Sequence, residues 1–220
     1  MLLKDERVAV CFSGEPRSLN YTHESLRKFL DNNFGNYDVF AYLPEGQTTD
    51  QLEQYFPEAE ILIKKDEYID DTGIPTRHKF KTGKQRYLQQ INGWKQSNMM
   101  RKEKESRDGF KYDYVVRSRM DVRYTKFDLD LDLKKGVLYI PDFHHFGGIN
   151  DRFCFSDGET IDKYLNVIDL YHMNPKICTH AETWLLKCLK KQQATISLID
   201  LRFNRIRQNG DECHWDSTDK

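Results

Sequence analysis

The 220-residue sequence contains no long hydrophobic run, and its five cysteines form no CxxC pair. A bilayer-spanning helix needs roughly 20 apolar residues, so we expect no membrane span. Residues 1–7 also lack the apolar core of a signal peptide. An odd cysteine count without metal-ligand spacing indicates reduced thiols rather than disulfides or a zinc centre. These absences together predict a cytoplasmic protein.

The sequence also has no marked excess of either positive or negative residues. The 34 Lys and Arg residues nearly balance the 35 Asp and Glu residues, which leaves a formal net charge of −1. This balance argues against nucleic acid as a partner, because nucleic-acid binding usually depends on a basic surface. Any anion must therefore be bound by a local cluster of basic residues. Hydrophobic residues make up 38% of the chain, which is enough for a packed core at this length.

Apolar runs and helical periodicity alternate along the first part of the chain. The strands expected there are 8–12, 37–43 and 60–63, and the helices are 20–34 and 51–56. A strand–helix–strand order is typical of a parallel sheet. The sequence therefore predicts an α/β fold, specifically an α/β/α sandwich around a mostly parallel sheet.

The rest of the chain continues this pattern. Further strands are expected at 112–116, 137–141, 152–155 and 196–199, and helices at 84–107, 159–171 and 181–191. The long helix is predicted despite Asn92-Gly93 in its middle, where a kink is expected. We expect one domain over residues 1–207, followed by a frayed polar tail, 208–220, which could link to a further domain.

Polar residues cluster where the expected strands end, which is where open α/β sheets bind ligands. The first cluster runs from Ser13 to Arg17 and includes Gly14. Glycine allows a ligand to approach the backbone, and an arginine beside a helix N-terminus can bind phosphate. An ordinary strand-to-helix turn with a surface arginine is the equally weighted alternative. Ser13, Gly14 and Arg17 are therefore candidate nucleotide-binding residues.

The second cluster places Arg117, Arg119 and Arg123 around Asp121. In an extended chain these alternating residues would share one side. Several cations together are costly without anions, so a diphosphate and Asp121 would neutralise them. The alternative is an internal ion-pair network around Asp121. A carboxylate here could also hold Mg²⁺ or Mn²⁺, which makes Asp121 a candidate metal ligand.

The third cluster lies between residues 142 and 152. Gly147 and Gly148 permit unusual backbone conformations or close approach of a ligand. Of the adjacent histidines His144 and His145, at most one would point into a site, and His145 is the candidate metal ligand. Packing or surface positions are the alternative for both. Asp151, at the end of this segment, is a candidate general base.

A fourth candidate is Glu182, at the start of an expected helix. Thr179 and Glu182 have the spacing of a capping box, which would give Glu182 a purely structural role. The alternative is that Glu182 faces the site as a general base. The alternation in Asp128, Asp130 and Asp132 indicates a solvated edge segment, and we keep it as a second-choice metal site.

The order of these motifs resembles that of GT-A-type glycosyltransferases. The matching segments are VAVCFSGEPR (8–17), YDVF (37–40), YDYVVRSRMD (112–121), GGINDRF (147–153) and AETWLL (181–186). They are most similar to the glycosyltransferase domains of chlorella viruses, large DNA viruses, which glycosylate the major capsid protein. One departure is that Arg123 stands where these enzymes have the second acid of an Asp-x-Asp pair.

This resemblance implies a GT-A fold, a UDP-sugar donor, Mn²⁺ or Mg²⁺ as cofactor, and a glycan or glycoprotein acceptor. It implies hexosyl or deoxyhexosyl transfer, with Arg17 beside the nucleotide and Asp121 at the metal and diphosphate. A nicotinamide enzyme is disfavoured, because no Gly-x-Gly-x-x-Gly follows the first strand. A nucleotidyltransferase on a similar sheet and a non-catalytic glycan-binding module are the alternatives.

Overall fold

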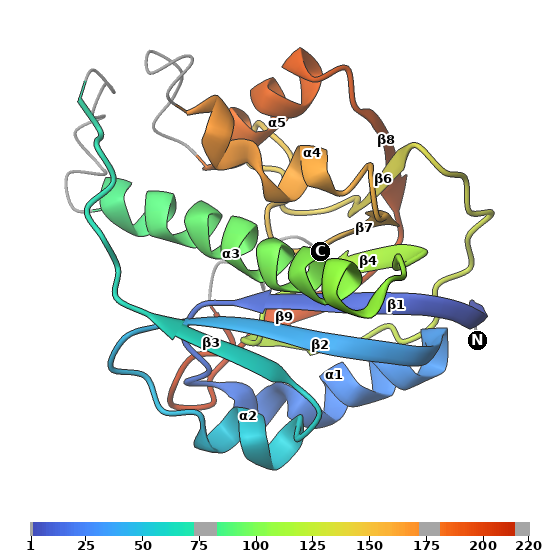
Figure 1. Ribbon diagram of the computed structural model, residues 1–220, viewed down its shortest axis with the longest axis horizontal. Coiled ribbons are helices and arrows are strands. Elements are labelled where there is room, and N and C mark those ends of the chain that lie inside the picture. Colours follow the sequence, from blue (N-terminus) through green and yellow to red (C-terminus); the bar gives the residue numbers. More distant parts are fainter. Residues whose placement is uncertain (1, 73–82, 172–180, 214–220) are drawn as a thin grey trace.

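A seven-stranded sheet lies between two layers of helices in the computed structural model, which describes residues 2–72, 83–171 and 181–213 (Figure 1). The strand order is β3-β2-β1-β4-β7-β6-β8. These strands are β1 (Leu3–Ser13), β2 (Phe34–Pro44), β3 (Glu60–Lys64), β4 (Tyr114–Arg117), β6 (Val137–Pro141), β7 (Cys154–Asp157) and β8 (Thr195–Ile199).

The sheet is mostly parallel, as the sequence predicts. Neighbouring strands are parallel from β3 through β2 and β1 to β4, and β6 is parallel to β8. Of the strands described here, β7 alone is reversed within this sheet, being antiparallel to both β4 and β6. The α/β/α sandwich predicted from the alternation of strands and helices is therefore confirmed.

Each face of the sheet has its own hydrophobic core. Val8, Val10 and Phe12 of β1 pack into one core, whereas Ala9 and Cys11 pack into the other. Alternate side chains of a strand point to opposite faces, so a strand covered on both faces is apolar throughout. This explains the uninterrupted apolar run that marks the first strand in the sequence.

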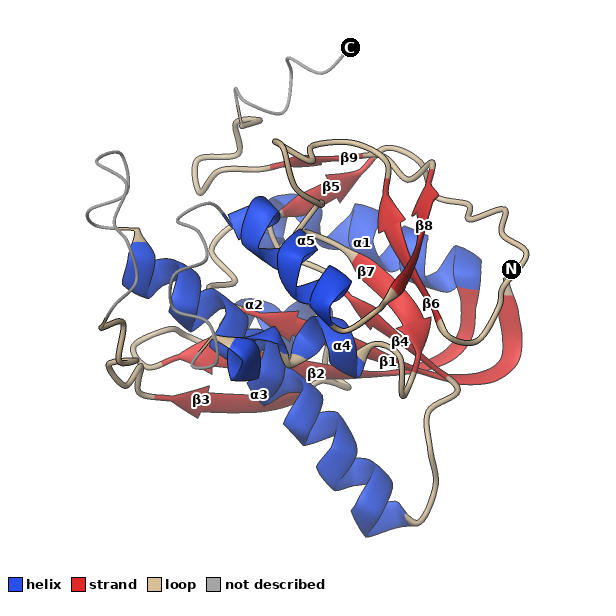
Figure 2. Ribbon diagram, turned by 90° about the horizontal axis from the view of Figure 1, so that it is seen from above, coloured by secondary structure: helices blue, strands red, loops and turns tan. Residues whose placement is uncertain are grey.

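Helices cover both faces (Figures 1 and 2). One face carries α1 (Leu19–Asn33) and α2 (Asp50–Tyr55). The other carries α3 (Lys84–Asp108), α4 (Asp162–Leu165) and α5 (Ala181–Lys191), together with the 3-10 helix η2 (Val167–Leu170). Among the described residues, no helix is both long and apolar enough to cross a membrane.

Helix α3 runs without interruption through the expected kink site. Gly93 instead brings the helix close to the sheet. A Cβ atom at Gly93 would lie 3.1 Å from Cβ of Ser13 and 3.3 Å from Cδ1 of Tyr42. The absence of a side chain therefore lets the N-terminal half of α3 pass directly beside the ends of β1 and β2.

Other elements differ from the sequence prediction. The helix expected over 159–171 is divided, because Asn166 has φ −99° and ψ 19°, outside the α-helical region, and separates α4 from η2. A second, two-stranded antiparallel sheet joins β5 (Val122–Tyr124) to β9 (Phe203–Arg205). Strands of three residues show too little alternation to be predicted.

The expected polar tail is not frayed where it is described. The backbone N–H of Arg207 donates to the carbonyl oxygen of Asp211 at 2.8 Å, and that of Cys213 donates to Arg205 at 2.8 Å. The chain thus turns back onto β9 as far as Cys213, which is buried. The part of the expected tail beyond residue 213 lies outside the described residues.

Candidate functional site

A cavity of about 590 Å³ opens at the carboxyl ends of β1, β2 and β4. In the sheet, β2 and then β3 lie on one side of β1, whereas β4, the next strand along the chain, pairs with β1 on its other side. The order of the strands therefore reverses at β1. Ligands of open α/β sheets bind in the crevice at such a reversal of strand order. The cavity is lined by Ser13, Gly14, Glu15, Arg17, Tyr42, Pro44, Asp66, Tyr68, Gln85, Arg86, Gln89, Gln90, Gly93, Arg117, Arg119, Met120 and Asp121.

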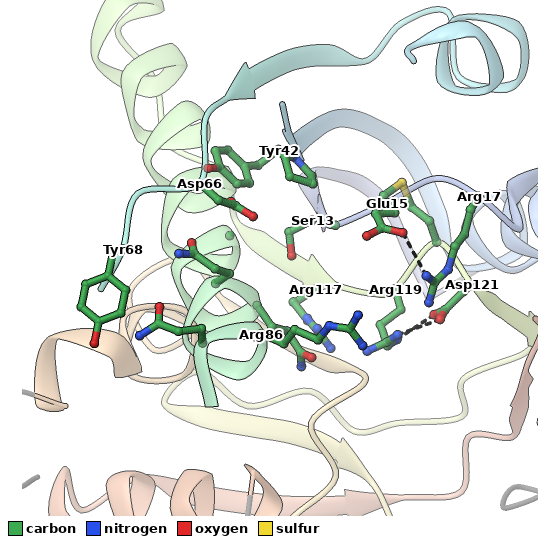
Figure 3. Close-up of a pocket in the computed structure, with 17 residues that line it drawn as sticks. Ser13, Glu15, Arg17, Tyr42, Asp66, Tyr68, Arg86, Arg117, Arg119 and Asp121 are labelled. Atoms are coloured by element: carbon green, nitrogen blue, oxygen red, sulfur yellow. Dashed lines mark hydrogen bonds and ion pairs between the residues drawn. The ribbon is translucent and has the colours of Figure 1, made fainter. Parts of the chain in front are cut away.

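The two ends of the cavity differ in chemistry (Figure 3). Tyr42, Asp66 and Tyr68 lie at one end, whereas the arginines Arg17, Arg86, Arg117 and Arg119 lie toward the other, with Asp121. An aromatic end can stack on a planar ring, and a group of guanidinium groups can bind phosphate. The cavity thus has the division expected of a nucleotide site.

Arg117 is the most deeply buried of these arginines, with 2% of its surface exposed. It ends β4, its guanidinium lies 4.4 Å from the centroid of the Trp94 ring, and its Nη1 donates to the backbone carbonyl of Asp151. Burial lowers the pKa of Arg117. Among the described residues no carboxylate lies within ion-pairing distance of this guanidinium, and its Nε has no hydrogen-bond partner. A buried cation without a carboxylate partner favours binding of an anion.

Arg119 and Asp121 form a bidentate ion pair at the arginine end. Nε and Nη2 of Arg119 donate to the two carboxylate oxygens of Asp121, each at 2.7 Å. Burial alone would raise the pKa of Asp121, but the charge of Arg119, supported by Arg205 and Arg17, outweighs it and lowers this pKa. Asp121 is therefore a carboxylate, and both of its oxygens already have a cationic partner.

The chain does not stay extended through this cluster. It turns at Met120 and Asp121, and β5 begins at Val122. The expectation that Arg123 shares the side of Arg117, Arg119 and Asp121 is therefore wrong, because alternation holds only in an extended chain. Arg123 lies outside the cavity lining, 3.8 Å from Glu212. The turn nevertheless brings the other three residues to one cavity.

The residues present do not fit the divalent-cation site that the resemblance implies. Mg²⁺ and Mn²⁺ are bound by several oxygen ligands, whereas each oxygen of Asp121 already accepts an N–H of Arg119, whose positive charge would lie beside any bound metal ion. Within the described ranges, no three His, Cys, Asp or Glu side chains are grouped so that they could hold a metal ion. Among these described residues, Asp121 and His145, the two metal ligands expected from the sequence, therefore do not belong to a common group of potential ligands.

The two candidate bases are close enough to influence each other. Asp151, just before β7, is 7% exposed, and its Oδ2 accepts a hydrogen bond at 3.0 Å from Nε2 of the cavity residue Gln90. Glu182 lies in the first turn of α5. Burial, followed by the charge of Asp151, raises the pKa of Glu182 to about 7. A carboxyl group that titrates near neutral pH suits a general base.

Glycine at position 148 is explained by packing. A Cβ atom there would lie 2.0 Å from the carbonyl carbon of Glu182, and the N–H of Ile149 donates to the Glu182 carbonyl oxygen at 3.0 Å. The loop carrying Gly148 therefore positions the first turn of α5. Gly147, with φ +80°, has open space around its Cα. Neither glycine is among the residues that line the cavity.

His145 lies in the same loop, also outside the cavity lining. Its Nδ1 accepts a hydrogen bond from the backbone N–H of Asn150 at 3.1 Å, which holds the loop in shape. Its Nε2 is buried without a hydrogen-bond partner among the described residues. Thr179, the expected cap of the helix that starts near Glu182, lies outside the described residues. Asp128, Asp130 and Asp132 also contribute nothing to the cavity lining.

Sequence reasoning missed the contribution of α3. Arg86, Gln90 and Gly93 line the cavity at intervals of four and three residues, which is the spacing of one helix face. This polar face, interrupted by a glycine, was the feature of the sequence that could have indicated that α3 lines a site. Asp66 and Tyr68 had no comparable signal, because they lie in an irregular segment after β3.

Comparison with known proteins identifies a family without a described activity. The family model "Domain of unknown function (DUF7796)" matches residues 3–174, and the chain belongs to this family. No curated protein matches it. These comparisons do not bear on the expected likeness to chlorella-virus enzymes, which stays a prediction.

Two crystal structures of glycosyltransferase GlyE from Streptococcus pneumoniae TIGR4, one in the apo form, are similar to the chain. Their identities are 17% and 16%, and their TM-scores 0.46 and 0.47. They cover 87% and 88% of this chain, which spans only 45% of the GlyE chain in each case. A likeness this distant does not bear on activity.

Proposed function

We propose that this member of the DUF7796 family transfers a sugar from a nucleotide-diphospho-sugar to a hydroxyl group of a glycan or glycoprotein. The observation that carries the proposal is Arg117, a buried guanidinium that lines the cavity with no carboxylate partner among the described residues. A buried cation is stabilised when an anion occupies the cavity. The diphosphate of a nucleotide sugar supplies that anion.

The shape and chemistry of the cavity support a nucleotide sugar over a smaller phosphate. Its volume of about 590 Å³ is within the range of small-molecule sites. The base and ribose would lie beside Tyr42, Asp66 and Tyr68, and the diphosphate beside the arginines. Uridine is the expected nucleoside, on the basis of the sequence resemblance alone.

The acidic pair supports transfer over simple binding. In the reaction, the bond between the anomeric carbon and the diphosphate oxygen breaks, and the acceptor oxygen bonds to the same carbon. The electron pair of the broken bond leaves with the nucleoside diphosphate, whose charge the arginines stabilise. The proton of the acceptor hydroxyl passes to the Glu182 carboxylate, next to Asp151. Gln90 and Arg117, which contact Asp151, connect this pair with the donor cavity.

The test is a screen of UDP- and GDP-sugars with a panel of sugar acceptors, in which released nucleoside diphosphate and glycosylated product are measured. We expect release from one nucleotide class, together with stoichiometric product when an acceptor is present. Release of inorganic phosphate or pyrophosphate instead would indicate a phosphatase or a nucleotidyltransferase. Absence of both nucleotide binding and turnover across the panel would overturn the proposal.

Arg117→Met and Arg123→Gln form a matched pair for this screen. Removing the guanidinium of Arg117 should weaken nucleotide binding by about tenfold or more, because charge-assisted contacts to phosphate are lost. The unfolding free energy of the Arg117→Met variant in urea should be unchanged or higher than that of the wild type, since a buried charge without a carboxylate partner is replaced by an apolar side chain. Arg123, outside the cavity, should tolerate the change without loss of binding. Equal effects of the two substitutions would contradict the role of Arg117.

A further inference from the structure

We propose that the site holds the diphosphate with arginine side chains in place of a divalent cation, and that Asp121 is a positioning residue for Arg119 and not a metal ligand. This inference rests on the proposed function, because it concerns how the same cavity binds a nucleotide-sugar donor. Such a site would bind its donor without the metal ion that the sequence resemblance implies.

The first support is the state of the Asp121 carboxylate. Each of its oxygens accepts an N–H of Arg119 at 2.7 Å, which is the strong, fork-shaped pairing of guanidinium with carboxylate. A divalent cation could reach Asp121 only through the remaining lone pair on each oxygen, and it would then lie beside the Arg119 guanidinium. Repulsion between two unscreened cations makes this arrangement costly at a part-buried site, where Asp121 is 15% exposed.

The second support is the position of the other two acids in the cavity lining, Glu15 and Asp66. Glu15 is bound to Arg17, with 2.9 Å between its Oε2 and Nη1 of Arg17. Asp66 lies at the opposite end, beside Tyr42 (Figure 3). Magnesium is usually held by one or two carboxylates together with phosphate oxygens. Among the described residues at the arginine end of this cavity, both carboxylates, Glu15 and Asp121, have an arginine partner.

The third support is charge. Four arginines of the cavity lining, Arg17, Arg86, Arg117 and Arg119, outnumber its three carboxylates, those of Glu15, Asp66 and Asp121. The lining therefore has a net positive charge before any metal ion is bound. This charge attracts the diphosphate of a nucleotide sugar, and a bound divalent cation would add to it.

Asp121 has a defined task in this arrangement. By binding Nε and Nη2 of Arg119, it fixes the plane of that guanidinium at the cavity wall. Its own backbone is held in turn, because the carbonyl oxygen of Asp121 accepts the N–H of Ile206 at 2.7 Å. A guanidinium fixed before the reaction stabilises the leaving diphosphate better than a mobile one.

The first experiment is calorimetry of the full chain with UDP and with GDP as probes, in EDTA and then in excess Mn²⁺. We expect one of the two nucleotides to bind in EDTA with an affinity within about threefold of that in Mn²⁺, and more weakly as salt is raised. Binding that appears only with Mn²⁺ would overturn this inference and leave the proposed function standing. No binding in either condition would overturn both.

Two substitutions test the role of Asp121. In EDTA, Arg119→Gln should weaken binding of the nucleotide by about tenfold, since a charge-assisted phosphate contact is lost. Asp121→Asn should strengthen that binding severalfold, because a negative charge beside the phosphates is removed, yet lower kcat, because Arg119 loses its bidentate partner. Higher affinity together with lower kcat would identify a positioning role, because loss of a merely structural residue would lower both quantities.

A metal ligand would behave differently. If Asp121 held Mn²⁺, Asp121→Asn would lose Mn²⁺-dependent affinity, and Arg119→Gln would gain it by releasing the carboxylate; either result would overturn the inference. Arg123→Gln is the matched control, because Arg123 is nearby in sequence but lies outside the cavity lining. Thermal unfolding of each variant shows whether it is folded, and the two cavity variants provide independent tests if one is not.

Discussion

Nε2 of Gln90 donates a hydrogen bond to Oδ2 of Asp151 at 3.0 Å, so one side chain belongs both to the cavity and to the acidic pair. Gln90 comes from α3, whereas Asp151 precedes β7. The bond therefore connects the region assigned to the donor with the region assigned to the base. A reaction that uses both the donor region and the base region thus depends on the packing of α3 against the sheet.

Replacing Gln90 by Leu should lower the turnover number by about tenfold and nucleotide affinity by less, because the carboxylate of Asp151 loses its donor and shifts. Loss of a hydrogen bond to a buried carboxylate should also cost about 1–3 kcal/mol of unfolding free energy. Steady-state kinetics and urea unfolding measure the two effects. Gln89→Leu is the matched control, because Gln89 also lines the cavity but bonds to the carbonyl of Glu67. Similar turnover losses in both variants would contradict the link through Asp151.

The transfer rate should depend on pH through Glu182. Its pKa is raised to about 7 by burial and by Asp151, while Arg152 and Arg205 act in the opposite direction. Because a base must be deprotonated, kcat should rise with pH up to about 7 and then level off. Glu182→Gln should lower kcat by about 10²–10⁴-fold and remove this rise. A pH–rate profile that keeps its rise in the variant would assign the base to another residue.

The same pKa predicts a loss of stability with rising pH. The folded pKa of Glu182, about 7, lies above its usual 4.5, so the folded state binds the proton more tightly than the unfolded state. Stability from this group is fully present below about pH 4.5 and is lost as pH rises through 7. Unfolding free energies between pH 4 and 8 should fall by roughly 1–3 kcal/mol more for the wild type than for Glu182→Gln. Parallel curves for the two proteins would show that this carboxyl group keeps its ordinary pKa.

Gly148→Ala should be among the most damaging single-methyl additions. The added Cβ would meet the Glu182 carbonyl carbon at 2.0 Å, so the backbone of the loop or of α5 must move. We expect a loss of roughly 3 kcal/mol in chemical denaturation, together with reduced turnover as Glu182 is displaced. Gly136→Ala is the control, because its φ of +82° brings backbone strain but no contact within 4 Å. A larger loss for the control would show that strain, rather than close packing, dominates at these glycines.

The positions of the main strands and helices could be predicted from the sequence because each follows a simple pattern of apolar and polar residues. The strand at 137–141 agrees at both ends with β6, and the predicted helix 84–107 differs from α3 by one residue. Strands buried on both faces are continuously apolar, and a long helix has a recognisable polar and apolar period. The reversed direction of β7 could not be read in the same way, since an apolar strand carries no sign of its direction.

The candidate site was predicted only in part. Ser13, Gly14, Arg17, Arg117, Arg119 and Asp121 do line one cavity. The bidentate pairing of Arg119 with Asp121 matches the ion-pair network that the sequence left open as an alternative, whereas the turn at residues 120–121 departs from the extended chain assumed there. The contribution of Arg86 and Gln90 depends on where α3 crosses the sheet. Such contacts between distant segments have no local signal in the sequence.

The hydrogen bond from Ile206 to the carbonyl of Asp121 has a consequence for the order of folding. During synthesis, β1 to β4 are complete once Arg117 has been made, and they can pair with one another. The pairing of β5 with β9 must wait for the C-terminal part of the chain, and contacts of such high sequence separation form late. A nascent chain would therefore have its central parallel strands before the Arg119–Asp121 pair reached its final place, which must wait until residues 203–206 have been made.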